Sequence, residues 1–254
     1  MRTTVYNACV DDLKGKTVLI TGGARRLGRS MVLAVASAGA QVAFTYLNST
    51  DDADQTSKEL DKLAVKHRML RCDVRSENSV MRTVEQVQET FGGIDLLINN
   101  AGVFETAALE KISQEQWENV FATNVGGPFL MTKHCTSALR LAKGRIINLG
   151  SLGGERPWVT HGHYCASKAA LHMLTRVTAK ALAPDVAVNC VAPGMINAGE
   201  GERDPSLLKR LAERAPTARN GTPEDVVSAV MYFATGPHYI TGQILFVDGG
   251  LGLV

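Results

Sequence analysis

The sequence predicts a single α/β domain in which a doubly wound parallel sheet is covered by helices on both faces. The chain has 254 residues, of which 45% are hydrophobic and 20% charged, and this composition suits one large domain with a sizeable core. Short β-branched runs alternate with longer segments of helical period along the chain. The runs are apolar enough to be buried on both faces, which is typical of strands in a parallel sheet.

Seven runs of this kind are expected to form the strands of the sheet. In chain order they are Thr17–Ile20, Gln41–Tyr46, His67–Cys72, Asp95–Ile98, Gly144–Leu149, Asp185–Val191 and Gln243–Val247. Because helical segments separate them, we expect neighbouring strands to run parallel and the domain to be doubly wound.

Start and stop signals of helices stand between these runs. Gly39 can end a helix over Ser30–Ala38, because glycine adopts the left-handed conformation common at helix C-termini. Ser76 is a candidate N-cap, and Gly92 stops the periodic segment that follows it. The hydroxyl of Thr222 precedes a proline and two acids, which favour the first turn of a helix.

Two segments are expected to lie outside the regular layers. Residues 1–14 form a polar N-terminal arm, since they lack the apolar stretch of a signal peptide. The segment 193–220 is rich in glycine, proline and charge and is too long for an ordinary connection. We therefore expect it to be a substrate flap, a mobile cover over a site.

Composition also argues against several classes of partner. The formal net charge is +2 without a basic stripe, so no nucleic-acid partner is expected. No apolar run approaches the roughly 20 residues that a membrane helix needs. The five cysteines are an odd number without a CxxC pair, which favours reduced thiols and a cytoplasmic location. His161, His163 and His172 lie near one another in the sequence, but their spacing fits no zinc site and we expect no metal.

The segment Thr21–Gly28, TGGARRLG, follows the first expected strand and opens a helix. Glycines at such a turn let the backbone approach a diphosphate, towards which the amides and the helix dipole point. An NAD site usually has a carboxylate about 20 residues further on, but no acid occurs from Arg29 through Thr50. Arg25 and Arg26 stand in the loop instead, and guanidinium groups suit the 2′-phosphate of NADPH.

Tyr164 and Lys168 lie four residues apart in a segment of helical period and therefore share one face of the helix. An ammonium beside a phenol favours the phenolate, so this tyrosine can exchange a proton nearer neutral pH. Ser151, thirteen residues before the tyrosine, can hydrogen-bond the same reacting oxygen. The three residues together indicate proton transfer to a substrate.

The chain resembles the short-chain dehydrogenase/reductase family over nearly its whole length. The motifs that carry the resemblance are TGGARRLG, NNAG from Asn99, Asn124, Ser151, YCASK from Tyr164, the Pro193-Gly194 turn and the ending TGQILFVDGG. The resemblance implies a seven-stranded Rossmann fold, usually in a homotetramer. It also implies catalytic roles for Asn124, Ser151, Tyr164 and Lys168, with Asn124 holding a water molecule in a proton relay.

The cofactor-binding residues are expected along the carboxyl ends of the strands, from the glycine loop to the Pro-Gly turn. They are Gly22, Arg25, Arg26, Leu27, Gly28, Tyr46, Asn48, Ser49, Asp73, Val74, Asn100, Ala101, Gly102, Tyr164, Lys168, Pro193, Gly194 and Ile196. Of these, the resemblance assigns Asp73 and Val74 to the adenine and Pro193, Gly194 and Ile196 to the nicotinamide.

Two features point to different substrates. Arg26 replaces the middle glycine of the usual family loop, which is typical of pteridine reductases and their bacterial relatives, and Phe104 stands where those enzymes stack a pterin. Ser151 stands where they carry an aspartate, and serine suits a carbonyl oxygen better because it is a poor net proton source. His163 and Trp158 are expected to shape the substrate pocket or an interface, and core packing is an equal alternative for Trp158.

We therefore expect an NADPH-dependent oxidoreductase that reduces a small-molecule carbonyl to an alcohol with Tyr164 as proton donor. A 3-oxoacyl-acyl-carrier-protein reductase and a small-ketone reductase both fit this description. A pteridine or dihydropteridine reductase is one alternative. A catalytically silent NADPH-binding regulator is the other, although a regulator would need only the cofactor half of the site.

Overall fold

The computed structural model describes residues 13–198 and 204–254. Seven strands form one parallel sheet in the order β3-β2-β1-β4-β5-β6-β7, which is the Rossmann arrangement and confirms the expected fold. The strands are β1 Thr17–Ile20, β2 Gln41–Tyr46, β3 His67–Arg71, β4 Leu96–Asn99, β5 Arg145–Leu149, β6 Ala187–Pro193 and β7 Ile244–Val247.

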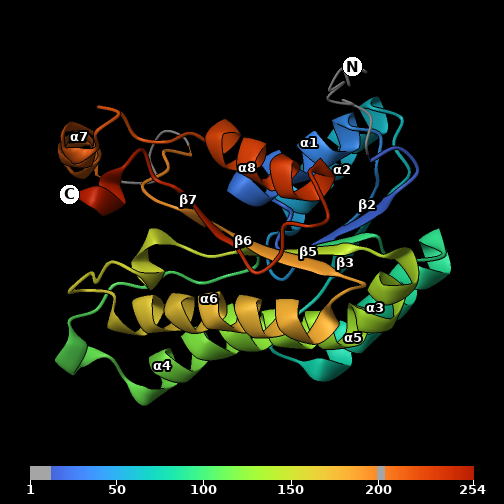
Figure 1. Ribbon diagram of the computed structural model, residues 1–254, viewed down its shortest axis with the longest axis horizontal. Helices are drawn as coiled ribbons and strands as arrows, with labels where there is room; N and C mark the ends of the chain where they lie inside the picture. Colours follow the sequence, from blue (N-terminus) through green and yellow to red (C-terminus); the bar gives the residue numbers. More distant parts are fainter. Residues whose placement is uncertain (1–12, 199–203) are drawn as a thin grey trace, which may run out of the picture.

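Helices cover both faces of the sheet (Figure 1). The helices are α1 Arg26–Ser37, α2 Thr50–Lys62, α3 Glu77–Phe91, α4 Gln114–Phe121, α5 Gly127–Ala142, α6 Gly162–Leu182, α7 Pro205–Arg214 and α8 Pro223–Thr235. In Figure 1, α1, α2 and α8 lie above the sheet and α3, α5 and α6 below it. Among the described residues, no helix is both long enough and apolar enough to cross a membrane.

Strand β1 shows why the sheet needs both helical layers. Val18 and Ile20 belong to the apolar cluster that packs with α1 and α8. Leu19, between them, belongs to the cluster on the opposite face with α3, α5 and α6. Successive side chains of a strand point to opposite faces, so a run without polar residues is stable only when both faces are covered.

The helix signals of the sequence are largely confirmed. Ser76 is the N-cap of α3, where its side chain accepts a hydrogen bond from the Ser79 amide. Gly92 ends this helix with a φ of +84°, in the left-handed region. Before α8, the Asp225 carboxylate accepts a hydrogen bond of 2.7 Å from the amide of Thr222.

Several boundaries differ from the sequence-based expectation. The strands β4 to β7 begin one or two residues later than expected, because an apolar run does not show where ladder pairing starts. The segment 193–220, which was expected to be a flap outside the regular layers, contains the helix α7; its residues 199–203 lie outside the described residues. Of the expected arm, residues 1–12 also lie outside them, and Leu13 is buried in the core rather than part of a polar arm.

The strand order reverses between β1 and β4, which are neighbours although β2 and β3 lie between them in sequence. In an open α/β sheet, ligands bind beyond the carboxyl ends of the strands at this switch point. The glycine loop follows β1 and the NNAG segment includes the end of β4, so both meet there.

Candidate active site

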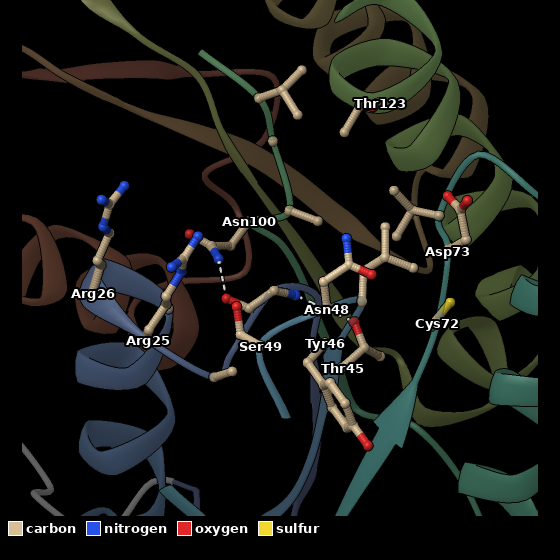
Figure 2. Close-up of a pocket in the computed structure, with 18 of the residues that line it drawn as sticks. Arg25, Arg26, Thr45, Tyr46, Asn48, Ser49, Cys72, Asp73, Asn100 and Thr123 are labelled. Carbon is tan, nitrogen blue, oxygen red and sulfur yellow. Dashed lines mark hydrogen bonds between the residues drawn. The ribbon is translucent and has the colours of Figure 1, made fainter. Parts of the chain in front are cut away.

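A cavity of about 550 Å³ opens at the carboxyl ends of β1 to β4. Figure 2 shows Arg25 and Arg26 at one end of it and Asp73 at the other, with Tyr46, Asn48 and Ser49 between them. It is lined by thirteen of the expected cofactor-binding residues, which are Gly22, Arg25, Arg26, Leu27, Gly28, Tyr46, Asn48, Ser49, Asp73, Val74, Asn100, Ala101 and Gly102.

The glycine loop lies so close to the end of β4 that side chains do not fit. Gly22 has a φ of +65°, and a Cβ atom on it would lie 3.0 Å from the Cα of Ala101. A Cβ atom on Gly28 would lie 2.0 Å from the Gly22 carbonyl oxygen. The side-chain nitrogen of Asn100 donates to the backbone carbonyls of Thr21 and Gly22, both at 2.9 Å, and holds the loop against the end of β4. The loop backbone is thus fixed and open to a ligand on the cavity side.

The two loop arginines occupy the first positions of α1. Arg25 is the N-cap in an extended conformation, and Arg26 has a φ of +51°, a left-handed conformation that disfavours residues other than glycine. The first turn of α1 carries no acid. Because cations are unfavourable at a helix N-terminus, this charge arrangement suits a bound anion.

Carboxylates do occur just beyond β2, but they stand outside the cavity. Asp51 and Asp52 lie in the first turn of α2, where acids are favourable. Neither residue lines the cavity, and the Asp52 carboxylate lies 4.0 Å from the Arg25 guanidinium. Just beyond β2, the side chains that line the cavity are thus Asn48 and Ser49 rather than carboxylates.

The far end of the cavity contains residues that the sequence did not single out. Arg75 donates to both carboxylate oxygens of Asp73, at 2.9 and 2.7 Å, and to the Asn119 side-chain oxygen at 2.8 Å. These hydrogen bonds hold the pKa of Asp73 below its usual value. The other lining residues that were missed are Ala24, Thr45, Leu47, Cys72, Val103, Asn119 and Thr123. Of all these residues, only Arg75 could have been found from the sequence, because it stands two residues after Asp73.

A second cavity, of about 220 Å³, adjoins the first and shares Leu27, Asn100, Gly102 and Val103 with it. Of the remaining expected residues, it brings together Ser151, Tyr164, Lys168, Pro193 and Gly194. These residues come from the ends of β5 and β6 and from the first turns of α6.

Lys168 is nearly buried, with 6% of its surface exposed. Its Nζ donates a hydrogen bond of 2.7 Å to the Leu149 carbonyl and lies 5.8 Å from the centre of the Tyr164 ring. Burial lowers the pKa of Lys168 to about 8, and the nearby Cys190 opposes this only in part. A buried ammonium of this kind favours negative charge on a neighbouring phenol.

Ser151 is buried at the end of β5 and begins the short turn Leu152–Gly154. Its Oγ accepts a hydrogen bond of 3.1 Å from the Gly153 amide, which leaves its own proton available to a substrate oxygen. Its backbone N–H donates to Nε2 of His172 at 3.5 Å. Burial, Lys168 and Arg176 lower the pKa of His172 to about 4, so this imidazole is neutral at neutral pH.

Two expected residues do not line either cavity. Asn124 lies in a π-helical turn, and its side chain accepts from the Val103 amide at 2.9 Å and donates to the Val103 carbonyl and Ser167 at 3.0 Å. These bonds tie the loop after β4 to α6. Ile196 pairs with Gly221 in an isolated bridge and packs against the core.

Aromatic rings surround Tyr164. Phe104 meets it edge-on at 4.8 Å and stacks on His161 at 4.5 Å, and Trp158 lies nearly parallel to Tyr164 with ring centres 6.0 Å apart. Phe104 and Trp158 both line the second cavity. The structure thus places Trp158 at the site rather than in the core.

The three histidines near Tyr164 in sequence have different surroundings. His161 contacts Phe104, and His172 lies behind Ser151. His163 is fully buried, with its Nε2 4.0 Å from a Glu105 carboxylate oxygen. Within residues 13–198 and 204–254, no group of three or more His, Cys, Asp or Glu side chains could hold a metal ion.

Comparisons with known proteins agree with this geometry. A family model described as Enoyl-(Acyl carrier protein) reductase matches residues 22–252. The 3beta-hydroxysteroid dehydrogenase 1 of Eggerthella lenta is 33% identical over 250 residues, covering 96% of either chain. The 3-oxoacyl-(acyl-carrier-protein) reductase FabG of Staphylococcus epidermidis is 33% identical over 240 residues, 93% of this chain and 98% of that protein.

A solved structure extends the comparison to three dimensions. It is the blue fluorescent protein from a metagenomic library in complex with NADPH, which is 31% identical and superimposes with a TM-score of 0.88. The match covers 94% of this chain and 99% of that protein.

Proposed function

Because the chain belongs to the short-chain dehydrogenase/reductase family of oxidoreductases, we propose that it is an NADPH-dependent reductase that converts a carbonyl group into an alcohol. The observation that carries the proposal is the second cavity, where Ser151, Tyr164 and Lys168 meet beside the long cavity of the glycine loop. A carbonyl placed there can be bound and protonated by the chain's own side chains.

The residues present fit a nicotinamide dinucleotide. The glycine loop has no room for side chains, and the adjoining cavity runs from the two arginines to Asp73. Gly22, Leu27 and Gly28 would hold the diphosphate, and Arg25, Arg26 and Ser49 the 2′-phosphate. Asp73 and Val74 would hold the adenine, and Pro193 and Gly194 the nicotinamide. The relative solved with NADPH supports the phosphorylated form.

The bound nicotinamide supplies the hydride, and the chain supplies position and the proton. Ser151 Oγ, which accepts from the Gly153 amide, donates a hydrogen bond to the carbonyl oxygen and orients it. Tyr164 transfers its phenolic proton to this oxygen as negative charge develops there. Lys168 stabilises the phenolate that remains, and its hydrogen bond to Leu149 fixes its position. Asn124 holds the loop that faces Lys168 through its side-chain hydrogen bonds to Val103. In addition, Asn124 would hold the water molecule of the proton relay.

The test is consumption of NADPH, followed by absorbance, with a panel of 3-oxoacyl thioesters, small ketones, quinones and pterins. We expect carbonyl compounds to be reduced, and NADPH to be preferred over NADH. Tight binding of NADPH without turnover of any compound would instead support the catalytically silent regulator.

A pterin is the second candidate substrate. Phe104 is 44% exposed and lines the cavity beside Tyr164, so a flat ring can lie against it. Reduction of a pterin C=N bond needs a net proton source at nitrogen, and Ser151 is a weak one. Reduction of dihydropterins faster than of any ketone in the panel would favour this alternative.

We propose further that the protein is a cytoplasmic homotetramer. Large apolar side chains are exposed on α5 and α6, namely Phe129, Leu141, Met173 and Val177. Exposed apolar side chains of this size favour association. The described cysteines Cys72, Cys135, Cys165 and Cys190 are free thiols, and Cys9 lies outside the described residues. Light scattering after size-exclusion chromatography measures the mass, and a monomer would contradict the assembly.

A further inference from the structure

Trp158 lines a further cavity besides the one that contains Ser151 and Tyr164. This cavity has a volume of about 290 Å³ and lies between the loop after Ser151, helix α7 and the last residues of the described chain. Figure 1 shows α7 beside this C-terminal segment. We refer to it as the α7 cavity.

The α7 cavity combines apolar walls with two positive charges. Leu152, Pro157, Leu211, Leu251 and Val254 form its apolar walls, and two arginines from separate segments, Arg156 and Arg214, also line it. No carboxylate side chain of the described residues lines it. An apolar space with two guanidinium groups selects a ligand with an aliphatic part and an anionic end.

Of the acids near the lining residues in sequence, Glu155 is exposed and does not line the cavity, and two others have partners of their own. The Asp248 carboxylate accepts from the amides of Gly250 and Gly252, at 2.9 and 2.8 Å, and the Glu213 carboxylate lies 4.0 Å from Lys209. Arg214 lies in the last turn of α7, where a cation is favourable, so the helix dipole accounts for its charge. The helix dipole does not account for the charge of Arg156, which donates a hydrogen bond to the Gly252 carbonyl at the other wall of the cavity.

Trp158 connects the α7 cavity with the reaction centre. Its ring lies nearly parallel to that of Tyr164, and its edge lies over Gly153, where an added Cβ would be 3.2 Å from the indole. Gly153 follows Leu152 of the α7 cavity and donates to Ser151 Oγ of the catalytic one. Trp158 is the one described residue in the linings of both cavities, so the two cavities meet at the indole.

We propose that the α7 cavity binds the far end of the carbonyl substrate, and that this substrate is an oxo acid, a ketone joined by an aliphatic chain to a carboxylate. The proposal rests on the proposed reductase function and adds its substrate class. Arg156 and Arg214 bind the carboxylate, and the three leucines contact the chain.

The first test compares each oxo acid with its neutral methyl ester. The probes are 4-oxopentanoate, 6-oxoheptanoate and 8-oxononanoate, measured through NADPH consumption. For the acid long enough to span the two cavities, we expect a KM roughly 5- to 20-fold below that of its ester. Arg156→Ala and Arg214→Ala should abolish this difference and leave the KM of the esters unchanged. Lys209→Ala, an exposed residue of the same helix that pairs with Glu213 and does not line the cavity, is the matched control.

The second test measures binding without turnover. The chain has two tryptophans, so Trp117→Phe leaves Trp158 as the only indole reporter. With NADP⁺ present, octanoate should change the Trp158 fluorescence saturably, and octanol should bind more weakly by roughly fivefold or more. Arg214→Ala should remove the preference for octanoate.

The outcomes separate the two proposals. Equal KM values for every acid and its ester, together with equal binding of octanoate and octanol, would overturn the oxo-acid assignment even if ketones are reduced. Arginine-dependent binding of octanoate without reduction of any ketone would support the anion site and contradict the reductase function.

Discussion

The backbone N–H of Ser151 donates a hydrogen bond of 3.5 Å to Nε2 of His172, two turns along α6 from Tyr164. The imidazole fills a space that two glycines leave free. A Cβ atom on Gly150 would lie 2.5 Å from Nε2, and one on Gly154 would lie 2.6 Å from Cε1 of the ring. His172 is thus placed to fix Ser151, and it does not itself line the cavity that contains Ser151.

His172 is therefore expected to be a positioning residue for Ser151. His172→Leu should lower kcat by about tenfold, because a misplaced Ser151 no longer orients the carbonyl oxygen, while the Kd of NADPH stays unchanged. His172→Gln, which retains an acceptor, should restore most of the loss. Steady-state kinetics and cofactor titration check both variants. An equal loss of activity in the two variants, without rescue by glutamine, would indicate a packing role alone.

His172 should also make the protein less stable in mild acid. Its pKa is about 4 in the folded protein and 6.5 as the ordinary value, so below pH 6.5 the unfolded chain binds a proton that the folded protein excludes. The free energy of unfolding should then fall by about 2 kcal/mol between pH 7.5 and pH 5. Urea unfolding of the wild type and His172→Gln measures this. A variant with the same pH dependence as the wild type would contradict it.

Removal of the phenolic hydroxyl should separate chemistry from cofactor binding. Tyr164→Phe retains the ring that contacts Phe104 and Trp158 but has no proton to transfer. We expect kcat to fall by roughly 10²- to 10⁴-fold and the Kd of NADPH to stay within about twofold. Turnover and fluorescence titration with NADPH measure the two quantities. Wild-type turnover would rule out Tyr164 as the proton donor.

The sequence predicted the fold well because two signals agree at each strand. The apolar runs are too short for helices, and they alternate with capped helical segments, as Ser76 and Gly92 show for α3. Most of the residues expected to bind the cofactor line the two adjoining cavities, because they stand at strand ends within recognisable motifs. Helix α7 was missed, since its charged residues and the surrounding glycines and prolines hide an amphipathic pattern.

What the sequence could not predict depends on contacts between distant segments. Asn124 carries a family motif, yet its side chain holds Val103 and Ser167 instead of lining a cavity. Arg75 and Asn119 meet at the Asp73 end of the larger cavity across 44 positions of sequence. The role of His172 depends on Gly150 and Gly154 being free of side chains where the helix passes, and no local pattern encodes such a fit.

Lys168 should set the alkaline limit of the reaction. Its pKa is about 8, so the ammonium that stabilises the Tyr164 phenolate is lost as the pH rises through this value. We expect kcat/KM for a ketone to fall above pH 8. The free energy of unfolding changes in the opposite direction. Between pH 8 and 10.5, Lys168 has lost a proton in the folded protein that the unfolded chain still binds, so the contribution of Lys168 to the free energy of unfolding increases as the pH rises. A kcat/KM that stays constant to pH 9.5 would show that the charge of Lys168 is not required.

Arg26 provides the sharpest test of cofactor choice, because its backbone conformation favours glycine whereas its guanidinium group favours binding of a 2′-phosphate. Its φ of +51° suits glycine, so Arg26→Gly should leave the free energy of unfolding unchanged or slightly increase it. The same change removes a guanidinium from the cavity, and we expect the Kd of NADPH to rise about 10- to 100-fold while that of NADH changes little. Arg29→Ala is the matched control, since Arg29 lies on the same helix and pairs with Glu59 outside the cavity. Calorimetric titration with both cofactors and urea unfolding measure the three quantities. Equal weakening of NADPH and NADH would mean that Arg26 does not contact the 2′-phosphate, and the cofactor preference would then depend on Arg25 and Ser49.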